Sequence, residues 1–320
     1  MDMDSITGKF KVFSGSSNPG LAERICRELN LHLGKIKLSR FKSGEIYVHY
    51  EESVRNFDVF LVQSLSHPIN EHFMELLVMI DAAKRASART INVILPYYGY
   101  ARQERKTAPR EPISAKLVAD LLTTAGASRV ISLDLHAPAI QGFFNIPVDH
   151  LTALDLITDE LKLRGIPHPV VVSPDAGRAT TAEKLSNYLD CPFAIMIKKR
   201  PAHNESVITH VIGDVEGRTP IIIEDMIDTG NTIINVVESL KERGANNAYV
   251  CATHPVFSDN ALDRLNHPMI EEVIVTDSIA VPEERSDKIK VISIAPMLSN
   301  AIKIITQGGS ISTLFKSGGV

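Results

Sequence analysis

The stretch that decides the fold is Ile221-Ile222-Ile223-Glu224-Asp225-Met226-Ile227-Asp228-Thr229-Gly230-Asn231-Thr232. Its branched apolar start is typical of a parallel strand that is covered on both faces. Beyond the turn, apolar residues recur at helical spacing as far as Leu240, and Gly244 is a plausible end of that helix. The stretch therefore predicts a buried strand, a polar turn and a helix.

The turn within this stretch carries groups that suit a sugar phosphate. Backbone N–H groups and the hydroxyls of Thr229 and Thr232 can donate to a phosphate, and the start of a helix favours an anion. Glu224 and Asp225 come just before the turn, where carboxylates can accept hydrogen bonds from sugar hydroxyls. We therefore expect a sugar-phosphate site here. The alternative is an ordinary strand–helix turn with Thr232 as its N-cap.

The size and composition of the chain set broad limits on its class. The chain has 320 residues, enough for two domains of ordinary size. Hydrophobic residues make up 44% and charged residues 22%, proportions typical of a soluble globular protein. The net charge of -4 gives no indication of a nucleic-acid or membrane partner. The N-terminus is acidic and lacks the apolar core of a signal peptide, and no apolar run reaches the length of a membrane span.

The three cysteines point to a reducing compartment. Cys26, Cys191 and Cys251 are odd in number, far apart, and outside any spacing typical of metal ligands. We interpret them as core thiols, and the cytoplasm is the expected location.

Short apolar runs alternate with helical patterns along the whole chain. The expected strands are 9–14, 59–63, 91–96, 130–135, 170–173, 193–197, 221–224, 248–253, 272–276 and 289–294. The expected helices are 21–29, 70–86, 113–125, 154–164, 178–189, 232–243 and 297–307. This alternation predicts an α/β fold with mainly parallel sheets. A break in the pattern near 145–151 predicts two domains, 1–150 and 151–320.

The segment 97–112 is a positively charged loop between an expected strand and an expected helix. It carries four basic side chains and two acidic ones, without apolar periodicity. We interpret it as a mobile loop whose cations can close over a polyphosphate and stabilise the transition state. A solvated, charged surface loop is the alternative.

Three further segments place polar residues at the ends of expected strands, where ligands gather in open α/β sheets. Strand alternation would put Ser132, Asp134 and His136 on one face, with His136 able to bind a metal or a phosphate oxygen. Asp175 follows the strand 170–173 and suits Mg²⁺, although it could equally brace the turn or cap the next helix. Residues 198–200, which are Lys-Lys-Arg, suit a flap that handles phosphate; solubilising surface charge is the alternative.

Taken together, these segments resemble the ribose-phosphate diphosphokinases (phosphoribosyl diphosphate synthetases) of the bacterial and eukaryotic type. The resemblance covers nearly the whole chain. Besides the stretch 221–232, it rests on the blocks 41–45, 79–86, 96–103, 134–137, 141–144, 172–177 and 253–258, which occur in order. Several such blocks at family-like spacing are far more specific than any single one.

The resemblance implies transfer of a diphosphoryl group from Mg-ATP to the 1-hydroxyl of ribose 5-phosphate, for nucleotide synthesis. It implies two phosphoribosyltransferase-like domains, each a mainly parallel sheet flanked by helices, with the last helix packing on the N-terminal domain. It also implies a cytoplasmic hexamer in which ATP binds between neighbouring subunits, and inorganic phosphate and ADP as effectors.

The resemblance also implies roles for individual residues. The ATP side would comprise Phe41, Ser43, Glu45, Arg102 and Gln103. The Mg²⁺ positions would be His136 and Asp175, and the catalytic flap cations would be Lys198 and Arg200. Ribose 5-phosphate would be held by Arg200, Glu224, Asp225, Asp228, Thr229, Gly230, Asn231 and Thr232.

The chain departs from the family pattern at Lys42, Ser43, Ala108, Pro109, Arg178, Glu224 and Asn231. Ser43 lacks the charge or the amide usual in the adenine loop, which would relax selectivity among nucleoside triphosphates. Arg178 stands where a glycine is usual and would either crowd the backbone or contact a phosphate. Glu224 is one methylene longer than the usual aspartate. Two other hypotheses are a weakly active paralogue that serves as a regulatory or assembly subunit, and a phosphoribosyltransferase.

Overall fold

The chain folds into two compact units. The computed structural model describes residues 10–202, 205–283 and 285–314. Unit 1 takes the described residues up to Thr152, together with Ser278–Ala280 and the described residues from Ser293 onward. Unit 2 comprises Ala153–Asp277 and Val281–Ile292. The boundary after Thr152 lies close to the expected one, but the units are not continuous in sequence, because the last helix belongs to unit 1.

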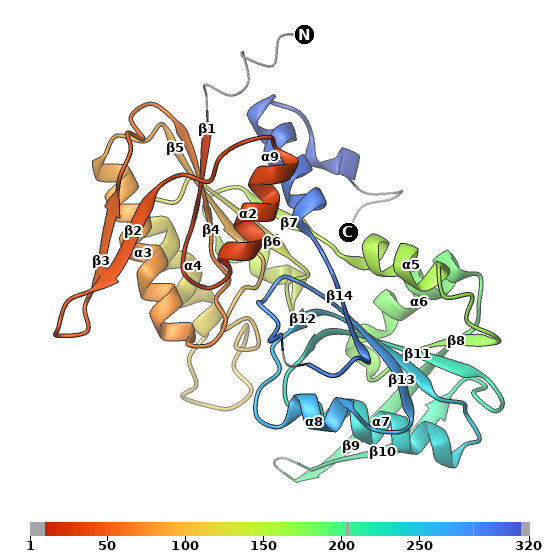
Figure 1. Ribbon diagram of the computed structural model, residues 1–320. Helices are drawn as coiled ribbons and strands as arrows, with labels where there is room; N and C mark the ends of the chain where they lie inside the picture. The colour runs from red at the N-terminus through yellow and green to blue at the C-terminus, as the bar shows by residue number, and fades with distance from the viewer. Residues whose placement is uncertain (1–9, 203–204, 284, 315–320) are drawn as a thin grey trace. The chain divides into compact units, whose positions relative to one another are not determined.

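Unit 1 is built on a parallel sheet of five strands in the order β1-β4-β5-β6-β7. The strands are β1 (Phe10–Ser14), β4 (Asp58–Val62), β5 (Thr90–Leu95), β6 (Arg129–Leu133) and β7 (Val148–Leu151). Its helices are α2 (Pro19–Glu28), α3 (Ile69–Arg85), α4 (Ser114–Ala125) and α9 (Ala295–Thr306), with the short η1 (Pro138–Phe143) and η3 (Ile311–Leu314). Helix α9 packs against α2 (Figure 1). Lys303 Nζ donates to the Glu28 carbonyl at 3.3 Å.

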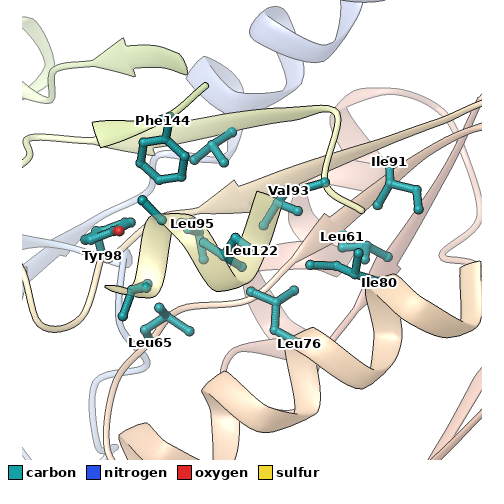
Figure 2. Close-up of a cluster of buried hydrophobic side chains, with 14 of the residues drawn as sticks. Leu61, Leu65, Leu76, Ile80, Ile91, Val93, Leu95, Tyr98, Leu122 and Phe144 are labelled. Carbon is teal, nitrogen blue, oxygen red and sulfur yellow. The ribbon is translucent and has the colours of Figure 1, made fainter. Parts of the chain in front are cut away.

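The core of unit 1 lies between the sheet and helices α3 and α4. Figure 2 shows Leu76 and Ile80 of α3 directed into the cluster that also contains Leu61 of β4 and Leu122 of α4. The central strands β4 and β5 consist mainly of buried apolar residues, which suits a parallel sheet covered by helices on both faces.

Unit 2 is built on a sheet of seven strands in the order β10-β9-β8-β11-β12-β13-β14. The strands are β8 (Pro169–Ser173), β9 (Phe193–Ala202), β10 (Glu205–Ile212), β11 (Thr219–Ile227), β12 (Ala248–Pro255), β13 (Ile270–Thr276) and β14 (Ile289–Ile292). All neighbours are parallel except β9 and β10, which pair antiparallel at one edge. The helices are α5 (Leu154–Lys162), α6 (Ala179–Leu189), α7 (Asn231–Glu242) and α8 (Ala261–Leu265), and η2 is Ala176–Arg178 (Figure 1).

The predicted α/β class with mainly parallel sheets is therefore confirmed, but several helices and strands were not predicted from the sequence. These are β7, β10, α8 and a two-stranded hairpin formed by β2 (Ile36–Arg40) and β3 (Ile46–Tyr50). The hairpin lies over α3, and its residues Ile36, Leu38, Val48 and Tyr50 pack on the core of unit 1. Their period-two spacing was the available signal, since one face of the hairpin is covered and the other is exposed.

The cysteines are free thiols, as expected, but only two of them are core residues. Cys26 and Cys251 are buried, whereas Cys191 is partly exposed, so its assignment to the core was wrong. Burial, with a contribution from Glu23, raises the pKa of the Cys26 thiol to about 11. Among the residues described, no helix has the length and apolarity needed to cross a membrane.

Alanine substitutions at two positions of α3, one buried and one exposed, test the assigned core of unit 1. Leu76 is fully buried on α3, whereas Met74 on the same helix is 52% exposed. We expect Leu76→Ala to lower the free energy of unfolding by about 3 kcal/mol, because it removes buried methyl groups and leaves a cavity. Urea denaturation followed by circular dichroism measures this loss. Met74→Ala is the matched control, and equal destabilisation by both variants would contradict the assigned core.

Candidate active site

The acidic pair of unit 2, Glu224 and Asp225, lies inside a strand. The expected end of the strand at residue 224 was wrong, because β11 continues to Ile227 and its last two residues still pair with β12, at His254 and Pro255. Glu224 and Asp225 therefore have the fixed backbone of a sheet. Asp225 is buried, with 7% of its surface exposed, and Glu224 is partly buried.

The turn that follows β11 is completed by a glycine in a left-handed conformation. Gly230 has φ 79° and ψ -9°, and α7 begins at the next residue, Asn231. A side chain at this position would be strained, since L-residues seldom adopt such backbone angles. The N-cap of α7 is Gly230, which has no side chain, so the alternative that made Thr232 the N-cap was wrong. The positive end of the helix dipole lies at this turn.

Three successive carbonyls of this turn are held by one neighbouring segment, residues 257–264. The backbone N–H of Phe257 donates to the Ile227 carbonyl at 3.0 Å, and that of Ser258 donates to the Asp228 carbonyl at 3.1 Å. Arg264 Nη1 donates to the Thr229 carbonyl at 2.8 Å. Because hydrogen bonds from a second element fix all three peptide units, the turn has a defined conformation before any ligand binds.

Arg264 is a residue of α8 whose role the sequence did not reveal. Besides its bond to the turn, Arg264 Nη2 lies 3.0 Å from Asp259 Oδ2. This hydrogen bond lowers the pKa of the Asp259 carboxyl. The block 253–258 marked the preceding strand end, but Arg264 lies beyond it, in a helix too short to give a periodic signal.

Arg178 pairs with both acids of β11. Its Nη2 lies 2.5 Å from Asp225 Oδ2, and its Nε lies 4.0 Å from Glu224 Oε2. Arg178 is the last residue of η2, and Asp175 begins this short turn. Of the two outcomes expected for Arg178, crowding of the backbone or contact with a phosphate, neither describes this geometry, in which the guanidinium faces carboxylates.

Asp175 caps its own turn. Its Oδ1 accepts a hydrogen bond from the Gly177 N–H at 3.0 Å, and Ser173 Oγ donates to its carbonyl at 2.6 Å. The capping alternative therefore describes the contact of Asp175 Oδ1, and the role of Asp175 in binding a metal stays a prediction. Lys198 and Arg200 belong to β9, where Lys198 pairs in register with Ile208 of β10. The side chains of Lys198 and Arg200 lie outside the described part of the chain.

His136 of unit 1 lies just beyond β6, which ends at Leu133. The expectation that Ser132, Asp134 and His136 share one strand face was wrong, because Asp134 has φ 35° and breaks the alternation. The loop is held instead by His150, whose Nε2 accepts a hydrogen bond from the Leu135 N–H at 2.9 Å. His150 lies in β7, a strand that the sequence pattern did not reveal.

The expected adenine residues lie at the tip of the β2–β3 hairpin. Phe41 is 56% exposed, and its ring meets Tyr47 edge to face at a centroid distance of 5.5 Å. The tip is closed by the Phe41 N–H donating to the Glu45 carbonyl at 2.9 Å and by Ser43 Oγ donating to Glu45 Oε2 at 2.6 Å. An exposed aromatic face on a closed turn is a surface on which a flat base can stack.

Arg102 and Gln103 are exposed at the start of the positively charged loop that follows β5. The backbone of Gln103 ties this point of the loop down: its N–H donates to the Tyr100 carbonyl at 3.0 Å, and its carbonyl accepts from the Ala115 N–H at 3.3 Å. The side chains of Arg102 and Gln103 therefore extend from a part of the loop whose backbone is held by hydrogen bonds.

The expected metal residues belong to different units, His136 to unit 1 and Asp175 to unit 2. No group of three or more His, Cys, Asp or Glu side chains that could hold a metal occurs within the residues that the structure describes. The assignment of these two residues to a metal stays a prediction.

Comparisons with known proteins decide the family. The family described as the N-terminal domain of ribose phosphate pyrophosphokinase matches residues 10–126, and the phosphoribosyl synthetase-associated domain matches 170–316. The ribose-phosphate pyrophosphokinase of Fusobacterium nucleatum subsp. nucleatum is 54% identical over 308 residues, which are 95% of this chain and 98% of that protein. The chain belongs to the ribose-phosphate pyrophosphokinase family.

Other members of this family agree in length and fold. The ribose-phosphate pyrophosphokinase of Bacillus subtilis is 49% identical over 306 residues, 95% of this chain and 96% of that protein. The crystal structure of phosphoribosylpyrophosphate synthetase from Mycobacterium smegmatis matches with a TM-score of 0.89 at 44% identity, covering 94% of this chain and 100% of that one. The family predicted from the sequence is therefore confirmed, and the fold class with it.

Removing the donor of Arg264 tests whether α8 fixes the turn. We expect Arg264→Met to speed amide hydrogen exchange in a peptide covering residues 227–233, because the Thr229 carbonyl loses its partner. The increase should be about fivefold, corresponding to about 1 kcal/mol of local stability for one hydrogen bond. Mass spectrometry measures the exchange.

Arg243→Met is the matched control for this variant. Arg243 Nη1 donates to the Ser239 carbonyl at 2.7 Å, near the opposite end of α7. Its loss should change exchange near residue 239 and leave the turn unaffected. Unchanged exchange of the turn in Arg264→Met would contradict the assigned role.

Proposed function

We infer that the protein transfers the diphosphoryl group of ATP to the 1-hydroxyl of ribose 5-phosphate, giving 5-phosphoribosyl 1-diphosphate and AMP. The observation that carries this inference is the identity of about one residue in two with ribose-phosphate pyrophosphokinases over nearly the whole length of both chains. This agreement favours an active transferase for nucleotide synthesis over the weakly active paralogue.

The turn between β11 and α7 is proposed to receive ribose 5-phosphate. The backbone N–H groups and hydroxyls of residues 228–232 would donate to the phosphate at the start of α7, where the N-cap is Gly230. Glu224 and Asp225 would accept from the sugar hydroxyls. The tertiary hydrogen bonds to the turn support this role, since a turn held in place loses little conformational freedom when ligand binds.

The hairpin tip and the start of the positively charged loop are proposed to receive ATP. Phe41 would stack on the adenine, while Ser43 and Glu45 would approach its polar edge. Arg102 and Gln103 would contact the phosphates, where a guanidinium matches phosphate geometry with two parallel hydrogen bonds. Lys198 and Arg200 of β9 are proposed as the catalytic cations, and Arg200 would also contact ribose 5-phosphate.

Mg²⁺ is proposed as the cofactor, with Asp175 and His136 as protein ligands. The Asp175 carboxylate fits this role chemically, because Mg²⁺ takes few protein oxygens and otherwise keeps waters and substrate phosphates. When bound, Mg²⁺ would neutralise charge on the phosphate oxygens. The chain's own contribution is positioning, since η2 fixes the backbone that carries Asp175.

The protein is further proposed to be a cytoplasmic homo-oligomer, most simply a hexamer, with inorganic phosphate and ADP as effectors. An apolar stripe along α4 and the residue before it supports self-association. Ile113, Leu117 and Leu121 are all exposed there, one helical turn apart.

The activity is tested by incubating the pure protein with Mg-ATP, ribose 5-phosphate and inorganic phosphate, and measuring AMP and 5-phosphoribosyl 1-diphosphate by chromatography. We expect equal amounts of both products. Lys198→Ala should lose at least about 100-fold in rate, because it removes a cation from the transferring group. Wild-type protein that forms no more AMP than Lys198→Ala, with any nucleoside triphosphate, would refute the proposed activity.

The assembly is tested by light scattering coupled to size-exclusion chromatography. We expect a mass several times the 35.2 kDa of one chain. Leu117→Glu should reduce this mass, because it places a charge in the apolar stripe of α4, whereas Leu163→Glu, at an exposed leucine of unit 2, should not. A wild-type protein that stays monomeric at micromolar concentration would contradict the proposal.

A further inference from the structure

Arg178 is the cation that faces the acidic pair of the sugar-phosphate turn. Its guanidinium is bonded to Asp225 at 2.5 Å and lies 4.0 Å from Glu224. All three side chains are largely removed from solvent, with 17% of the Arg178 side chain exposed. Screening by water is therefore weaker here than for the exposed ion pairs of the protein.

This pairing changes the charge that a sugar phosphate would meet. Two carboxylates together carry two negative charges, and the guanidinium reduces the charge of the group to one. A phosphate that binds at the start of α7 is itself an anion, so an unpaired acidic pair on the adjoining strand would repel it. An arginine in this place weakens that repulsion between the acids and the phosphate.

The position of Arg178 is fixed by the turn that carries it. The Arg178 N–H donates to the Asp175 carbonyl at 3.3 Å, and the Asp175 side chain caps the same turn at Gly177. The guanidinium is thus presented from a short, closed backbone at the end of β8, the strand next to β11 in the sheet. A side chain held in this way can orient the carboxylates that it contacts.

We propose that Arg178 is a positioning residue for ribose 5-phosphate, which acts by orienting Glu224 and Asp225 and by lowering their combined negative charge. The proposal rests on the proposed function, in which the sugar phosphate occupies the turn after β11. Arg178 acts through the acids and does not itself bind the phosphate.

The first test compares Arg178→Gln, Arg178→Lys and wild type. Arg178→Gln should raise both the KM for ribose 5-phosphate and its Kd, measured by calorimetry without ATP, by at least about tenfold. The KM for ATP should change less than about twofold, since the residue serves only one substrate. Arg178→Lys keeps the charge but not the two-pronged geometry, and should recover part of the lost affinity.

Arg164→Gln is the matched control, because Arg164 also pairs with two carboxylates in unit 2, those of Glu160 and Glu272, and is similarly buried. It should lower the thermal midpoint while leaving the KM for ribose 5-phosphate unchanged. An equal rise in that KM in both variants would show a general structural role for such pairs and overturn the proposal.

A double-mutant cycle separates action through the acids from direct contact with the phosphate. If Arg178 acts through the acids, Asp225→Asn and Glu224→Gln should each cost less in the Arg178→Gln background than in wild type. Strictly additive losses at both acids would mean that Arg178 acts independently of them, and would overturn the proposal. Failure of the proposed function is distinguishable, because wild-type protein would then form no AMP, whereas every outcome that overturns this inference leaves wild-type activity intact.

Discussion

The site depends on one constraint: the backbone that leaves a buried parallel strand must find partners for its polar groups. In unit 2 this constraint is met at the turn after β11, where the carbonyls of Ile227, Asp228 and Thr229 accept hydrogen bonds from the segment 257–264. An unpaired buried carbonyl would cost free energy comparable to a lost hydrogen bond. The bonds that satisfy the carbonyls also fix the turn, so the same interactions that stabilise the fold shape the candidate sugar-phosphate site.

Arginines hold this turn and its acids from two directions. Arg264 of α8 binds the backbone of the turn, and Arg178 of η2 binds the carboxylates of the strand before it. Each arginine comes from the segment that follows a strand next to β11, β12 for Arg264 and β8 for Arg178. The arrangement follows from a parallel sheet, in which neighbouring strands end at the same edge and their loops meet there.

The sequence predicted the elements whose signal is local. The strand that contains Ile221 and the helix that follows Gly230 were recognisable because branched apolar runs and helical spacing are visible along the chain. The role of Arg178 was not predictable, since its partners lie on another strand and only the sheet order brings them together. The role of His150 was not predictable for a similar reason. His150 belongs to β7, a short, half-buried edge strand with few apolar residues, and it contacts the backbone of a loop.

The central claim is that the turn between β11 and α7 receives ribose 5-phosphate. A crystal structure of the protein with ribose 5-phosphate tests it most directly. The account predicts the phosphate against the backbone N–H groups of residues 229–232 and sugar hydroxyls bonded to Glu224 or Asp225, with Arg178 still paired to those acids. Ribose 5-phosphate bound elsewhere, with this turn left empty, would contradict it.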